Sequence, residues 1–172
     1  MWQSRATLGA VQNAVSTAFA VPRVAIPATL LQTGGGKHTG DIYVMERVPQ
    51  HAGPETPLDM LNRPEGFFPF RSSDDSKAIL LVTKARTVTL TVRRTAASED
   101  PDRLSAARTG RLELTLADGS RLSGSATIEL PQHHSRLLDY LNASAEPFFA
   151  ITTAYEVHLV NRAHVLYARP ED

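Results

Sequence analysis

Two histidines and an arginine near the end of the chain have a spacing that could form a small anion site. His158 and His164 flank a predicted tight turn between two strands, and Arg162 lies within that turn. If the imidazoles face each other, the guanidinium could add a charge-assisted hydrogen bond to an anion. Lys84 and Arg86 lie in a similar short segment earlier in the chain. These five residues are the candidate ligand contacts, and a hairpin rim without a ligand is the alternative.

The sequence indicates no catalytic residue, cofactor site or metal site. The stretch TGGGKHTG at 33–40 resembles a phosphate-binding loop only in composition, because its lysine follows three glycines and a strand is predicted next. We interpret it as a hairpin. No G-x-S-x-G elbow is present. The absence of cysteine excludes disulfides, thiolate metal sites and a cysteine nucleophile, and it is consistent with a cytoplasmic protein. We therefore expect no cofactor and prefer a non-enzymatic function, with an enzyme as an alternative.

One phrase occurs twice, as LDMLNRPEGFF at 58–68 and as LDYLNASAEPFF at 138–149. Flanking blocks match in the same order: 37–46 matches 121–130, and 80–90 matches 158–168. This order indicates an internal duplication with units at about 22–92 and 109–170. The repeated residues are Leu58, Asp59, Leu61, Asn62, Phe67 and Phe68 in the first unit, and Leu138, Asp139, Leu141, Asn142, Phe148 and Phe149 in the second.

The repeated phrase is interpreted as a structural corner. Its leucines can plug the end of a small barrel, and its Asp and Asn can bond to nearby backbone. The Asn could also end the short helix in a left-handed conformation. Of the paired phenylalanines, one can enter the core while the other covers the helix, the other unit or a partner. We expect Leu138, Leu141 and one of Phe148 and Phe149 to be buried. Polar binding sites at the Asp and Asn positions are the alternative.

The second unit has the pattern of a small barrel. Leucines at 112, 114 and 116 alternate with polar residues, as in a half-buried strand, and Asp118-Gly119 predicts a turn. Gly124 lies inside the next strand, where glycine often marks a bend. The only helical segment is 135–142. Five short strands and one helical turn are typical of an SH3-like or Sm-like barrel. The fold class is therefore mainly β, with two tandem antiparallel barrels.

Four segments are predicted along the chain: an N-terminal amphipathic helix at 1–21, a first barrel at 22–92, a polar linker at 93–108 and a second barrel at 109–172. Leu8, Val11, Val15 and Phe19 form one stripe in the first segment. A signal peptide is the alternative there. We expect the stripe to be docked on apolar surface and predict a homodimer.

Composition limits the partners. The chain has 172 residues, 42% of them hydrophobic, and its eighteen basic and eighteen acidic residues cancel. Long-range attraction to nucleic acid or to an anionic membrane is therefore not expected. No apolar run reaches the roughly 18 residues of a membrane-spanning helix.

Part of the second unit resembles an uncharacterised family of bacterial small domains. The resemblance is carried by a R-L-x-D-x-L-N string at 136–142, Phe148-Phe149, and V-N-[KR]-A-H at 160–164. It covers about sixty residues of this unit and, more weakly, the first unit, where Thr83-Lys84-Ala85-Arg86 replaces Asn-Arg-Ala-His. The resemblance implies a domain type and no particular activity.

Three functions are consistent with these patterns. The first is a non-enzymatic protein-interaction or scaffold module with an unknown protein partner. The second is nucleic-acid or nucleotide binding by Sm-like barrels, for which fifteen arginines could gather on one face. Eleven aromatic residues without a stacking pattern argue against it. The third is an enzyme with a site between the two units. The interaction module is the preferred prediction.

Overall fold

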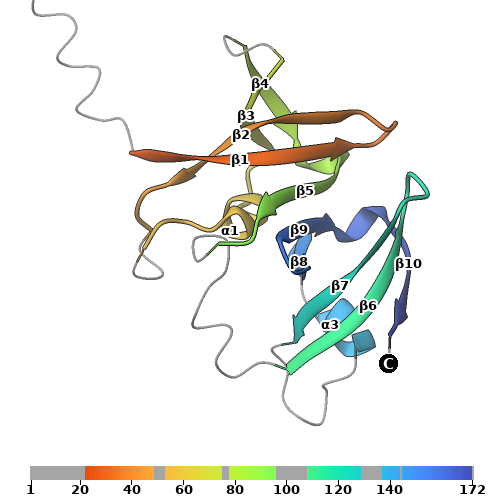
Figure 1. The fold of residues 1–172 in the computed structure, drawn as a ribbon. Coiled ribbons are helices and arrows are strands. Elements are labelled where there is room, and N and C mark those ends of the chain that lie inside the picture. Colours follow the sequence, from red (N-terminus) through yellow and green to blue (C-terminus); the bar gives the residue numbers. More distant parts are fainter. Residues whose placement is uncertain are drawn as a thin grey trace, which may run out of the picture.

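The protein is mainly β: in the part of the chain that the structure describes, ten antiparallel strands form a single sheet (Figure 1). The computed structural model describes residues 22–48, 53–74, 78–95, 108–128, 137–143 and 145–171. The predicted N-terminal helix and almost all of the predicted linker lie outside these residues. In the sheet the strand order is β10-β6-β7-β8-β9-β5-β1-β2-β3-β4.

Each half of the chain contributes the same succession of elements. In the first half the order within the sheet is β5-β1-β2-β3-β4, and in the second half it is β10-β6-β7-β8-β9. The first half consists of β1 (Arg23–Gln32), β2 (Lys37–Met45), α1 (Pro57–Asn62), β3 (Phe67–Ser72), β4 (Ile79–Thr83), the 3-10 turn η1 (Lys84–Arg86) and β5 (Thr87–Arg93). The second half consists of β6 (Arg108–Leu116), β7 (Arg121–Ile128), α3 (Leu137–Ala143), β8 (Phe148–Thr152), β9 (Glu156–Asn161), the 3-10 turn η3 (Arg162–His164) and β10 (Val165–Pro170).

Local irregularities also occur at corresponding places. The pairing of β5 with β1 passes over Val88, and the pairing of β10 with β6 passes over Leu166. Each of these residues is the second of its strand, so both halves have a bulge at the same point. This shared bulge fixes the residue correspondence between the two halves, in which Val88 matches Leu166 and Leu90 matches Ala168.

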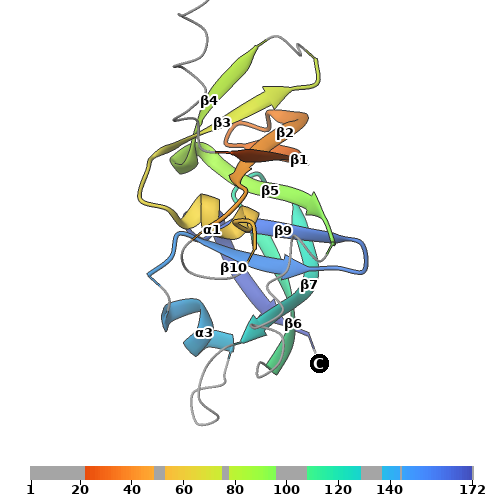
Figure 2. The same ribbon diagram turned by 90° about the vertical axis from the view of Figure 1, so that its left-hand side faces the viewer.

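The two halves meet at a seam, defined here as the antiparallel pairing of β5 with β9. Thr89 pairs with Val160 and Arg93 with Glu156. The sequence did not predict this pairing, which places strands from both halves in one sheet. Figure 2 shows α1 beside the second half, and α1 contacts β8 there.

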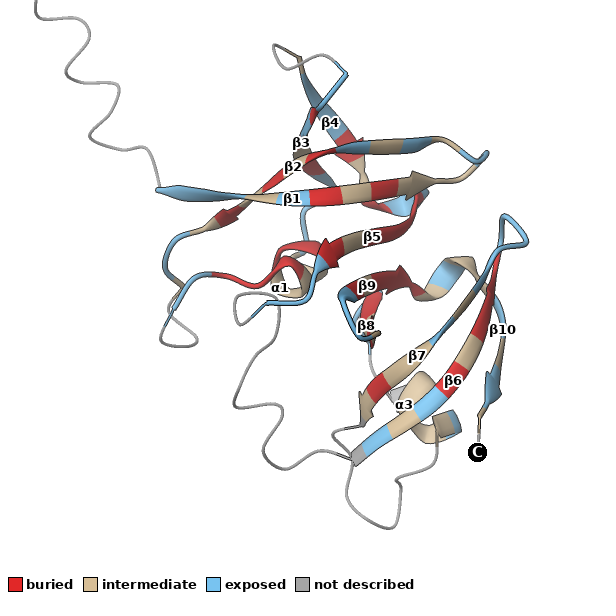
Figure 3. Ribbon diagram, in the orientation of Figure 1, coloured by how far each residue is buried: buried red, intermediate tan, exposed pale blue. Residues whose placement is uncertain are grey.

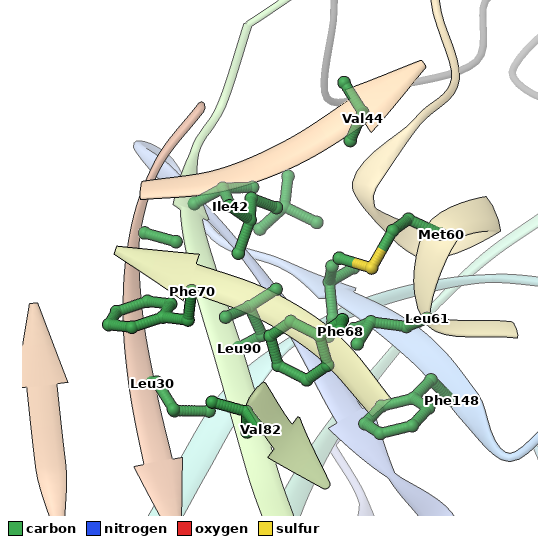
Figure 4. Close-up of a cluster of buried hydrophobic side chains, with 14 residues drawn as sticks. Leu30, Ile42, Val44, Met60, Leu61, Phe68, Phe70, Val82, Leu90 and Phe148 are labelled. Atoms are coloured by element: carbon green, nitrogen blue, oxygen red, sulfur yellow. The ribbon is translucent and has the colours of Figure 1, made fainter. Parts of the chain in front are cut away.

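The hydrophobic cores cross the seam in both directions. The cluster of the first half includes Phe148, Val157 and Leu159 from the second half, and Figure 4 shows Phe148 beside Leu61. The cluster of the second half includes Val88 from β5. Each half therefore completes the core of the other, and neither core is made by one half alone.

Burial of the repeated phrase differs in part from the expectation. Phe148 and Phe149 are both buried, one in each cluster, because neighbouring strand residues point to opposite faces. Leu141 is half-buried. The prediction for Leu138 is wrong, since this side chain is 67% exposed. The face of α3 that packs inward is Leu137, Tyr140 and Leu141, at helical spacings of three and four.

Two corresponding glycines allow β2 and β7 to approach their neighbours closely. A Cβ at Gly40 would collide with the carbonyl oxygen of Arg71 on β3. A Cβ at Gly124 would lie 2.5 Å from the Ile151 side chain on β8. The sequence predicted a bulge or bend at Gly124, but the pairing of β7 with β6 continues through this residue without a shift in register, and the glycine admits the close contact with β8.

We expect Gly40→Ala to lower the free energy of unfolding by about 1–3 kcal/mol, because a backbone atom must shift to admit the methyl group. Urea melts monitored by circular dichroism would measure this. Gly66→Ala is the matched control, since a Cβ there meets nothing within 4 Å. Equal losses in the two variants would contradict the explanation.

Candidate binding surface

The first predicted ligand contact, Lys84, is buried and holds the end of α1. Its Nζ donates to the carbonyl oxygens of Met60, at 3.0 Å, and Arg63, at 2.8 Å. Burial lowers the pKa of Lys84, an effect that the carboxylate of Glu65 opposes. A cation whose hydrogen bonds are directed to the last carbonyls of a helix is a C-terminal cap, and it is not presented to a ligand.

Arg162 has the same role in the second half. Its Nε donates to the carbonyl oxygen of Glu146 and its Nη1 to that of Leu141, both at 2.9 Å. The guanidinium also lies 4.7 Å from the centre of the Phe149 ring, close enough for a cation–π interaction. Lys84 and Arg162 occupy the first position of η1 and η3, so each half uses a cation there to cap its short helix.

The two histidines contact the first half and do not form a shared site with Arg162. His158 Nδ1 lies 3.0 Å from Thr91 Oγ1 across the seam. His164 Nε2 lies 2.7 Å from the carbonyl oxygen of Ala85. Arg86 is exposed. The five predicted contacts therefore lie near the seam, but four of them have partners within the protein.

Because of His158, we expect the folded protein to lose stability as the pH falls. Burial lowers its pKa from the ordinary value of 6.5, against a smaller opposing effect of the Glu156 carboxylate. The unfolded chain therefore binds a proton more readily than the folded one. Stability due to this residue is fully present above pH 6.5 and is lost as the pH falls toward the lower pKa of the folded state, by at most about 1.4 kcal/mol per pH unit.

Urea melts between pH 7.5 and 5 would measure this slope for the wild type and for His158→Gln. The variant should have the shallower slope over the acidic part of the range. Identical slopes would show that another group is responsible.

Asn62, from the repeated phrase, connects the halves. Its Oδ1 accepts from the backbone N–H of Phe148 at 2.9 Å, and its Nδ2 donates to the Phe148 carbonyl oxygen at 3.1 Å. The predicted left-handed conformation is wrong for this residue, because no non-glycine residue in the described part of the chain has a positive φ. Asp59 does bond to local backbone as predicted: it accepts from the Thr56 N–H in a capping box.

Asn161 makes the corresponding connection from β9. It is buried, and its Nδ2 donates to the carbonyl oxygens of Lys84, at 3.1 Å, and Thr87, at 3.0 Å. Its Oδ1 accepts from the Ala163 N–H at the start of η3. Asn62 and Asn161 therefore both form hydrogen bonds across the seam. These bonds explain why the two positions are polar without any need for a ligand.

The remaining candidate site is the pair of sheet edges. β4 and β10 lie at the two ends of the strand order, and within the described part of the chain each pairs on one side only. Figure 3 shows β5 and β9 largely buried and β4 and β10 largely exposed. We define the β4 edge as Phe67, Ile79, Leu80 and Leu81, and the β10 edge as Asn142, Leu166, Tyr167 and Ala168. All of these residues are exposed except the half-buried Ala168.

Sequence reasoning missed these edges. A signal was available in Ile79-Leu80-Leu81-Val82, an apolar run without the alternation of a strand that has one solvated face. Such a run is typical of a strand that is covered on both faces.

Comparison with known proteins finds no match among family models, curated proteins or solved structures. The resemblance to a bacterial small-domain family therefore stays a prediction. The described residues contain no group of three or more His, Cys, Asp or Glu side chains placed to hold a metal ion. Nor does that part of the chain include a helix long and apolar enough to cross a membrane.

Proposed function

We propose that this chain is a non-enzymatic, cytoplasmic interaction module, built from two duplicated SH3-like barrels, that binds an extended protein segment along its β4 edge. The observation that carries the proposal is the coincidence of unpaired strand backbone with exposed Ile79, Leu80 and Leu81. Addition of a strand to an open sheet edge is a common mode of peptide recognition, in which backbone hydrogen bonds give affinity and alternate side chains give specificity.

The backbone of β4 supports this mode of binding. The Lys84 N–H donates to the Gly66 carbonyl oxygen at 2.9 Å, which directs alternate residues of β4 toward β3. The residues between them, Ile79, Leu81 and Thr83, direct their N–H and C=O groups toward the open side. Natural edge strands usually carry lysine, proline or a bulge that blocks further pairing. β4 has the sequence ILLVT, with no charge and no proline.

Charge supports a protein partner over a nucleic acid. Several arginines are already paired with acidic side chains or carbonyl oxygens. Arg63 lies 2.7 Å from Glu55, Arg169 lies 3.0 Å from Glu113, and Arg162 caps α3. Each of these three guanidinium groups already faces a carboxylate or a carbonyl oxygen, which weakens the case for phosphate binding at these positions.

A displayed library of random peptides, selected on the wild type and then measured for affinity to the wild type and to Leu81→Lys, would test the proposal. Leu81 is exposed, so the variant should fold normally, while a lysine is expected to block an added apolar strand. Selected peptides should be apolar at alternate positions and should bind the wild type at least tenfold more tightly. Peptides that bind both proteins equally would refute the β4 edge as the binding site.

A further inference from the structure

We propose that the segment bound by the β4 edge is the β10 edge of a second copy of this chain, so that copies join head to tail. This inference rests on the proposed function and names its partner. It follows from the seam, where the protein already makes the same kind of junction between its own halves.

The seam provides the geometry. β5 is the last strand of the first half, and β9 is the fourth strand of the second half. The open strands are their counterparts: β10 is the last strand of the second half, and β4 is the fourth strand of the first half. The molecule therefore presents one unused copy of each surface that forms the seam.

Three apolar residues on the open edges are exposed, whereas the corresponding residues at the seam are buried. Leu81 is 74% exposed, whereas its counterpart Leu159 in β9 is 1% exposed. Phe67 is 62% exposed, whereas its counterpart Phe148 is 1% exposed. On the other surface, Leu166 is 61% exposed and its counterpart Val88 is fully buried. The same apolar positions are retained on both open edges, although only those at the seam are covered within one molecule.

The seam also gives the register. The Arg94 N–H donates to the Tyr155 carbonyl oxygen, so by alternation Leu90 and Leu159 exchange hydrogen bonds. Transferred to the open edges, Leu90 becomes Ala168 and Leu159 becomes Leu81. The expected pairs are then Ala168 with Leu81 as the hydrogen-bonded pair, and Arg169 with Leu80 as a neighbouring pair without backbone hydrogen bonds.

The hydrogen bonds of Asn62 at the seam also have a potential counterpart, at Asn142 on the β10 edge. Asn142 corresponds to Asn62, whose side chain binds both backbone groups of Phe148 at the seam. Asn142 is exposed. In the proposed junction it would bind the backbone of Phe67, the counterpart of Phe148, on the next molecule. Apolar and polar parts of the seam therefore recur together on the open edges.

Two differences make the junction weaker than the seam. The first difference is that Pro170 replaces Val92. The Glu171 N–H donates to the Arg111 carbonyl oxygen on β6, so by alternation the backbone of Pro170 faces the open side of β10. Proline has no N–H, so one backbone hydrogen bond of the junction is lost. Thr83 replaces Asn161, and its side chain is too short to repeat the two hydrogen bonds that Asn161 makes across the seam. We therefore expect reversible, concentration-dependent assembly.

The two surfaces are different, so each added copy leaves one β4 edge and one β10 edge free. Such heterologous contacts generate a ring if the rotation closes and a filament if it does not. A closed homodimer does not follow from this geometry. The number of copies is set by the rotation between neighbours, and the mass of the assembly would give it.

Engineered cysteines test the junction directly, because the chain has none of its own. The variant Arg169→Cys with Leu80→Cys places two thiols on a non-hydrogen-bonded pair, where the Cα atoms lie about 4.5 Å apart. Mild oxidation should then give a ladder of covalent multimers on a denaturing gel. The two edges lie at opposite ends of the sheet, so a disulfide within one molecule is not expected.

The matched control is Arg169→Cys with Leu81→Cys. It shifts one thiol by a single residue, which moves it to the other face of the strand. The control should yield less than about one-tenth of the covalent product. Ladders of equal strength in the two variants would show accidental collision and would overturn the proposed register.

Light scattering at increasing concentration completes the test. The wild type should grow beyond the monomer mass, and Leu81→Lys should remain a monomer. A wild type that stays monomeric and binds the selected peptides, together with an Arg169→Cys/Leu80→Cys variant that gives no ladder, would overturn this inference and leave the proposed function intact. Absence of both assembly and peptide binding would overturn both.

Discussion

Phe148→Ala is expected to lower the free energy of unfolding by about 3–5 kcal/mol, while Phe67→Ala changes it by less than about 0.5 kcal/mol. The two phenylalanines occupy corresponding positions at the start of β8 and β3. Phe148 crosses the seam into the cluster of the first half, so its removal leaves a cavity there. Phe67 is exposed and loses little when it is truncated.

Urea melts of the monomer, at a concentration below any assembly, would measure both values. The control for assembly is the same pair of melts in the Leu81→Lys background. A loss at Phe67 comparable to that at Phe148 would mean that the β4 edge is covered within the molecule.

Asn161→Ala is expected to cost about 2–4 kcal/mol. The substitution removes the donor for the Lys84 and Thr87 carbonyl oxygens and the acceptor for the Ala163 N–H. A buried polar group left without a partner costs about 1–3 kcal/mol, and the losses within one network are not additive.

The matched substitution is Thr83→Ala, at the corresponding position of β4. Thr83 is half-buried and its side chain does not cap η1, so we expect a loss below about 1 kcal/mol. Thermal denaturation followed by circular dichroism would rank the two variants. An Asn161→Ala protein as stable as the wild type would show that water replaces the lost hydrogen bonds.

Much of the fold within each half could be predicted from the sequence. Alternation of leucines at 112, 114 and 116 gave a strand whose leucines are all buried, and Asp118-Gly119 forms the predicted turn, with Gly119 at a positive φ. The glycines at 33–40 form a hairpin between β1 and β2, with positive φ at Gly34 and Gly35. Side-chain period and turn chemistry are local properties, so a single sequence reveals them.

The seam could not be predicted in the same way. Periodicity shows which face of a strand is buried, but it does not show which strand lies at its edge. Residues of β5 and β9 that pair are far apart in sequence, and nothing in either strand alone names the other. The prediction that Leu138 is buried was wrong for a related reason. Which side of α3 faces the core depends on the element that the helix packs against, and the sequence of the helix does not name that element.

The candidate site showed the same limit. Lys84 and Arg162 were predicted from the sequence as ligand contacts, and in the folded chain both side chains donate to backbone carbonyl oxygens. Their partners are helix carbonyls that lie about twenty residues earlier in the chain. Sequence identifies a cation with hydrogen-bonding capacity, whereas only the folded chain shows whether that capacity is already used.

The seam also has a consequence for synthesis of the chain on the ribosome. β5 is complete at Arg93, whereas β9 is complete only at Asn161. At 5–20 residues per second, roughly 70 residues take on the order of 3 to 15 s to emerge. During that interval the nascent first half presents Val88 and Leu90 on an edge whose final neighbour has not been made. The growing polypeptide therefore passes through a stage in which β5 is an unpaired edge strand that can pair with other chains. Chaperones that shield apolar segments are expected to act on this protein at that stage.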